Sequence, residues 1–127
     1  WCAACIDFWV LYFQSATIRT PLATSPSPSP RNNGGSGVAF PETLAKAIAG
    51  ISNVDTVIPG HIPVTTWSDF EEYQRFNADL VTASRAGIRA GQTAEQAATA
   101  FDLTGRYPEY RSDRIEVAFQ TIYEELQ

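Results

Sequence analysis

The chain has 127 residues, of which 44% are hydrophobic, and a formal net charge of −5. This composition is typical of one small globular domain. The nine Lys and Arg residues are scattered along an acidic chain, which argues against a nucleic-acid partner because phosphate binding requires clustered cations. We also expect no membrane partner, since no apolar stretch approaches the ~20 residues that cross a bilayer.

The first quarter of the sequence differs from the rest. It begins with apolar and aromatic residues, and the run from Ile6 to Phe13 is predicted to be a strand of a core. A Ser-Pro repeat follows at residues 25–30, where proline removes backbone donors and prevents helix or central strand. We therefore divide the chain into residues 1–32, an apolar plus Ser/Pro-rich segment, and residues 33–127, in which a Gly-rich flexible loop ends at Gly37 and an ordered α-rich region begins at Val38.

Hydrophobic periodicity and capping residues predict the elements of the second region. In chain order they are a helix at 41–52, a strand at 54–58, a loop at 59–66, a long helix at 67–89, a short helix from Thr93, an aromatic turn at 105–111 and a final helix from Ser112 or Asp113 to Leu126. Capping-box spacing, in which a hydroxyl precedes a carboxylate or amide by three residues, occurs at Thr93 and Gln96.

The long helix carries most of the large side chains. Its cap is expected at Thr66 or Ser68, and Ser68 with Glu71 has capping-box spacing. Trp67, Phe70 and Tyr73 fall on its apolar stripe, and we expect core packing for them rather than a substrate pocket. The adjacent acidic pairs at 71–72 and 124–125 are expected to be solvated, because neighbours on a helix point in different directions.

A single strand cannot form a sheet. We therefore expect the helices to pack on a sheet supplied by residues 6–13 or by a missing N-terminal half. The sequence also contains no Met and begins with Trp1, which favours a fragment or a product cut at its N-terminus. An apolar face left open by the missing sheet would favour self-association.

The most informative residue is His61, the only histidine. It follows the predicted strand directly, between Gly60 and Ile62, and a proline lies on each side of these three residues. Ligand sites in α/β proteins gather at the carboxyl ends of strands, and neutral imidazole is a common zinc ligand. The alternative is a lone loop histidine that only packs or caps, which is the commoner role of an arbitrary histidine.

Residues 55–63 closely resemble the strand and loop that end the metal site of the metallo-β-lactamase fold, an apolar strand followed by Pro-Gly-His. Residues 33–37 and 65–70 are similar to the neighbouring segments of that family. The resemblance implies the C-terminal part of a four-layer αββα sandwich, an α/β or α+β fold, that binds two zinc ions. Their bridging hydroxide would hydrolyse an ester, amide, thioester or phosphoester of a small-molecule substrate. By this resemblance, His61 is the terminal histidine ligand of the second metal.

Most of the family's metal ligands are missing from the sequence. The His-X-His-X-Asp-His cluster and the middle histidine are absent, because His61 is the only histidine. Asp7 is not assigned the bridging role, since its neighbours differ from the family's Gly-Asp pattern, and Ile62 replaces the usual second glycine. A zinc site needs three or four protein ligands. We therefore predict a C-terminal fragment of a zinc-dependent hydrolase that is inactive as an isolated chain and holds no catalytic residue.

Two other functions stay open. A small helical binding or interaction module without catalysis would carry the Pro-Gly-His sequence by coincidence. A thiol redox protein would use Cys2 and Cys5, which follow Trp1 in a Trp-Cys-X-X-Cys sequence. Such a redox site needs a strand before it and an amphipathic helix after it, and neither is predicted here. Zinc held by the two cysteines and His61 would still lack a fourth ligand.

Overall fold

The computed structural model describes residues 35–58, 63–110 and 112–127. Their elements, in chain order, are α2 (Phe40–Gly50), β1 (Thr56–Val57), β2 (Thr65–Thr66), α3 (Trp67–Arg89), α4 (Ala94–Ala100), α5 (Leu103–Arg106), the 3₁₀ turn η4 (Ser112–Arg114) and α6 (Ile115–Leu126). The described part is therefore rich in helix and contains one small antiparallel sheet, which confirms a coarse α+β class. None of its helices is both long enough and apolar enough to cross a membrane.

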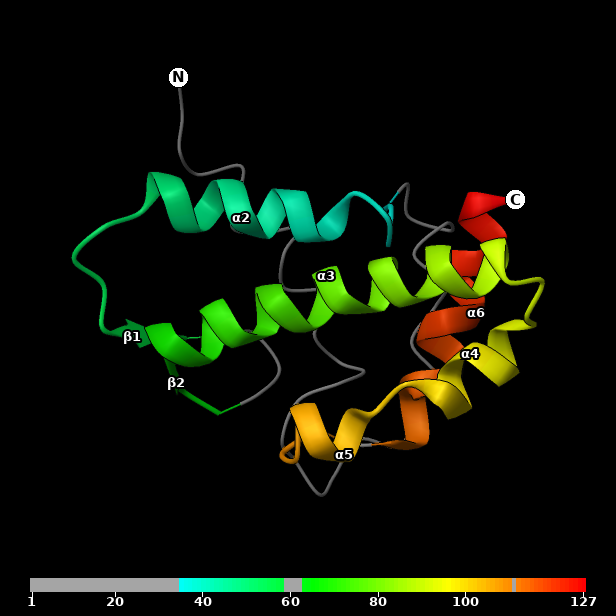
Figure 1. The fold of residues 1–127 in the computed structure, drawn as a ribbon. Helices are drawn as coiled ribbons and strands as arrows, with labels where there is room; N and C mark the ends of the chain where they lie inside the picture. Colours follow the sequence, from blue (N-terminus) through cyan, green and yellow to red (C-terminus); the bar gives the residue numbers. More distant parts are fainter. Residues whose placement is uncertain (1–34, 59–62, 111) are drawn as a thin grey trace.

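The long helix α3 is the centre of the arrangement (Figure 1). Helix α2 runs beside it, α4 and α6 pack against it, and the two short strands lie next to its first turn. The side chains at the centre of this packing, Leu44, Phe76 and Phe119, are fully buried. We expected the helices to pack on a sheet supplied from elsewhere. Within the described residues they pack on one another, because α2, α3 and α6 each present an apolar face to a neighbouring helix. Residues 6–13 lie outside the described residues, so a sheet supplied from there stays a prediction.

Helix α3 has the bounds that its periodicity predicts, 67 to 89. Its buried residues recur every three or four positions along one stripe. They are Phe70, Tyr73, Phe76, Asn77, Leu80, Val81, Ser84 and Gly87. Core packing is therefore confirmed for Phe70 and Tyr73, and Trp67 is partly buried against the same core. The helix is followed by Gly91 at a φ of 70°, a left-handed conformation that favours glycine.

The capping box of α3 is formed by Thr66 and Asp69, and not by Ser68 and Glu71. Thr66 is the N-cap, its side chain accepts from the Asp69 amide, and the Asp69 side chain accepts from the Thr66 amide. Both spacings fit a capping box, and the backbone decides between them. Thr66 is extended because it belongs to β2, whereas Ser68 is already inside the helix. The predicted capping box of α4, Thr93 with Gln96, is confirmed.

The remaining differences concern short elements. The helix predicted at 41–52 spans Phe40–Gly50, and the strand predicted at 54–58 shortens to Thr56–Val57. A second strand, Thr65–Thr66, occurs within the predicted loop, and the short helix α5 precedes and partly overlaps the predicted aromatic turn. Two-residue strands and single helical turns contain too few residues for a periodic pattern, so hydrophobic periodicity does not predict them.

Aromatic rings fill the space between α3 and the C-terminal half of the chain. Phe76 lies at the middle, with ring centroids 5.1 Å from Tyr107, 4.4 Å from Tyr110 and 6.5 Å from Phe101. Phe101 also contacts the Phe119 ring of α6, at 5.7 Å. These edge-on and tilted pairs are favourable geometries for aromatic contact, and they connect α3 with the segment that follows α4.

The Tyr123 side chain of α6 comes very close to the backbone of α3 at Gly87. A Cβ atom at this position would collide with the hydroxyl of Tyr123 and touch Ala97 of α4 tightly. Glycine is therefore needed where these three helices meet. The same contact buries Tyr123, whose hydroxyl has no hydrogen-bond partner among the described residues.

Candidate metal-ligand loop

The predicted metal ligand, His61, lies outside the described residues, as do Pro59, Gly60 and Ile62. What the structure describes is the frame on either side of this loop. Strand β1 pairs with β2 in antiparallel register, with Thr56 opposite Thr66 and Val57 opposite Thr65. The His61 loop therefore joins the two strands of a β-hairpin, which brings residues 58 and 64 close together at its base. Cys2, Cys5 and Asp7 also lie outside the described residues.

The first turn of α3 holds the hairpin through one carboxylate. The Asp69 Oδ2 atom accepts hydrogen bonds from the Thr65 hydroxyl at 2.5 Å, the Thr66 hydroxyl at 2.8 Å and the Thr66 amide at 2.9 Å. Just before β1, the Asp55 carbonyl accepts from the Trp67 amide at 3.1 Å. These bonds fix the direction in which the chain leaves the loop and enters the helix. Thr65 and Asp69 are missed by sequence reasoning, although the Thr-X-X-Asp spacing from Thr66 was a visible signal.

The base of the loop is apolar and exposed. Ile58, just after β1, is 77% exposed and Val64, just before β2, is 63% exposed. Ile51, which caps the C-terminal end of α2, is 44% exposed. Three of the four exposed large hydrophobic residues of the described part therefore lie between residues 51 and 64, and the fourth, Val117, lies on α6.

The described residues on either side of the loop contain no complete metal-ligand cluster of their own. Across 35–58, 63–110 and 112–127, no three His, Cys, Asp or Glu side chains are placed so that they could hold one ion. The Oδ2 atom of Asp69 accepts from two hydroxyl groups and one amide, so this carboxylate organises the turn. Zinc needs three or four protein ligands, and with one histidine in the whole sequence the remaining ligands would not be histidines of this chain.

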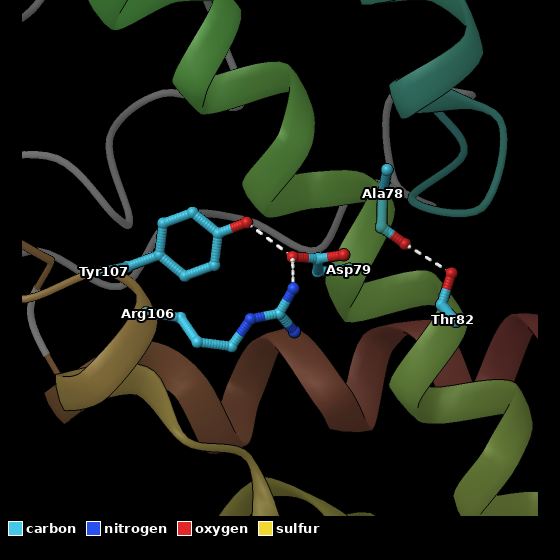
Figure 2. A network of polar contacts seen from close by, with 5 residues as sticks. All are labelled: Ala78, Asp79, Thr82, Arg106 and Tyr107. Atoms are coloured by element: carbon cyan, nitrogen blue, oxygen red, sulfur yellow. Dashed lines mark hydrogen bonds and ion pairs between the residues drawn. The ribbon is translucent and has the colours of Figure 1, made fainter.

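A second polar cluster joins α3 to α5 (Figure 2). The Tyr107 hydroxyl donates to Asp79 Oδ2 at 2.5 Å, and the Arg106 guanidinium contacts the same oxygen at 2.5 Å. Arg106 also lies over the Tyr107 ring, 5.8 Å from its centroid. The cluster is not predictable from sequence, because Asp79 and its partners are far apart along the chain. Its groups satisfy one another, so its role is to hold α5 on α3.

The environment of Tyr107 makes its hydroxyl a weaker acid. Burial raises the pKa of Tyr107 to about 12, and the hydrogen bond to Asp79 and the charge of Asp79 act in the same direction. The positive charges of Arg106 and Arg75 oppose this change. The hydroxyl therefore stays protonated and donates to the carboxylate over the whole physiological pH range.

One of the acidic pairs expected to be solvated has a structural role. Glu125 of α6 accepts from the Ser36 hydroxyl and, at 3.2 Å, from the Val38 amide. The Ser36 oxygen in turn accepts from the Ala39 amide at 2.9 Å. The C-terminal helix thus supplies the polar contacts at the beginning of α2, where the N-cap residue Ala39 has no side-chain acceptor. Its neighbour Glu124 is exposed, as expected.

No protein-family model matches the sequence, and neither the curated proteins nor the solved structures that were searched contain a significant match.

Proposed function

We propose that residues 33–127 are the C-terminal portion of a metallo-β-lactamase-fold, zinc-dependent hydrolase that acts on a small-molecule substrate, with His61 as one metal ligand. The observation that carries the proposal is the Pro-Gly-His sequence between two paired strands. A loop on a hairpin presents its side chains at one end of a fixed frame, and here Asp69 fastens that frame to the longest helix. This is the kind of support that a metal ligand needs.

The proposal assigns no catalysis to the isolated chain. A zinc-bound hydroxide requires a metal held by several ligands, and this sequence offers one imidazole. The complete αββα enzyme would supply the other histidines and the bridging carboxylate. His61 would then contribute one bond to the second of two zinc ions, and the loops of that complete enzyme would bind the substrate.

Zinc titration followed by NMR tests the metal-ligand role directly, because the only imidazole signals of the protein belong to His61. The titration is done with Cys2 and Cys5 replaced by serine, so that thiols do not compete for the ion. We expect zinc to shift the His61 resonances with an affinity weaker than micromolar. Ile62→Ala is the matched control, since it changes the loop and keeps the imidazole, and its zinc response should persist.

Two outcomes of the titration would contradict the proposal. Submicromolar zinc binding that is lost in His61→Ala would show a complete site and overturn the assignment of an inactive chain. Imidazole resonances that stay unchanged at millimolar zinc would overturn the ligand role. Family membership has a separate test in the DNA upstream of the Trp1 codon. A frame encoding His-X-His-X-Asp-His supports it, whereas a start codon and ribosome-binding site directly before Trp1 contradict it.

A small helical interaction module is the second candidate function. It is favoured by the packing of α2, α3, α4 and α6 on one another, which gives the described residues an apolar core of their own. A module of this kind needs no metal. It therefore predicts that the zinc titration leaves the His61 resonances unchanged, the opposite of the first proposal.

A further inference from the structure

We draw no further inference here: the strongest candidate, the exposed apolar pair Ile58 and Val64 at the base of the His61 loop, carries nothing because no feature of the described residues shows what covers it.

Discussion

At the scale of single residues, two buried tyrosines have opposite hydrogen-bonding situations. The Tyr107 hydroxyl donates to the Asp79 carboxylate, whereas the Tyr123 hydroxyl has no partner among the described residues. We expect Tyr107→Phe to lower the free energy of unfolding by about 1–2 kcal/mol, because it removes a hydrogen bond to a charged group. Tyr123→Phe should be neutral or stabilising by up to about 1 kcal/mol, because it removes an unpaired buried polar atom.

Urea denaturation of both variants under identical conditions checks this prediction. Each substitution removes the same atom from a ring that is less than a tenth exposed, so each variant serves as the control for the other. An equal loss of stability in the two variants would contradict the prediction. It would mean that the hydroxyl of Tyr107, which is bonded to Asp79, stabilises the fold no more than the unpaired hydroxyl of Tyr123 does.

The raised pKa of Tyr107 predicts how its contribution depends on pH. A tyrosine in an unfolded chain has a pKa of about 10, and in the folded protein the pKa of Tyr107 is about 12. Folding therefore favours the neutral hydroxyl, so the stabilisation is fully present below pH 10 and is lost as the pH rises towards 12. The stability difference between wild type and Tyr107→Phe should be constant from pH 7 to 9 and shrink above pH 10.

Denaturation midpoints measured at several alkaline pH values give this difference, and tyrosinate absorbance at 295 nm reports the ionisation itself. Burial also raises the pKa values of Tyr73 and Tyr110, so wild type and variant should both lose stability in this range. The comparison between them isolates Tyr107. A difference that grows with pH above 10 would contradict the proposed sign.

At the scale of elements, Asp69 connects the hairpin to α3. Asp69→Ala removes the acceptor of the Thr65 hydroxyl and of the Thr66 amide and hydroxyl. We expect a loss of about 1–2 kcal/mol in the free energy of unfolding, typical of a lost cap with one further hydrogen bond. We also expect faster amide hydrogen exchange in β1 and β2, because the hairpin is then held mainly by its short pairing.

The matched control for this prediction is Thr93→Ala, which removes the capping box of α4 and keeps the hydrogen bonds of Asp69 to the hairpin. It should cost about 1 kcal/mol and leave exchange in β1 and β2 unchanged. Equal acceleration of hairpin exchange in both variants would contradict the assigned role. It would indicate that the hairpin responds to global stability and not to Asp69.

The sequence predicts the long elements well and the short ones poorly. Helix α3 was predicted with its observed bounds because its stripe repeats over six turns and Gly91 terminates it. The hairpin was predicted only in part, because Thr65 and Thr66 are polar and precede a helix directly. Their strand conformation depends on pairing with β1. Local sequence offers two possible caps for α3, and this tertiary contact selects one of them.

At the scale of the whole molecule, the sequence predicts some polar features and misses others, as it does for the helices and strands. The His61 loop was predicted because its residues are contiguous in sequence, and it remains a prediction because it lies outside the described residues. The clusters around Asp79 and Glu125 were not predicted. The Asp79 side chain is 27% exposed and belongs to α3, whereas its partners Arg106 and Tyr107 lie in and just after α5. Neither periodicity nor a sequence motif therefore predicts this cluster. Contacts between distant segments become visible only once the helices are packed.

Glu125 connects the two ends of the described part, since it binds Ser36 and Val38 before α2 from a position in the last turn of α6. A double-mutant cycle with Ser36→Ala and Glu125→Ala should give a coupling free energy of about 1 kcal/mol, typical of a partly buried hydrogen bond to a carboxylate. Each single variant also loses one contact outside the pair, Glu125→Ala the bond from the Val38 amide and Ser36→Ala the bond from the Ala39 amide, so the two variants should lose similar stability. Glu116→Ala removes an exposed carboxylate from the same helix, and its coupling with Ser36→Ala should be near zero. Equal coupling in the two cycles would show that the effect comes from the charge of α6 and not from the contact, and the two ends of this part of the chain would then be held together by apolar packing alone.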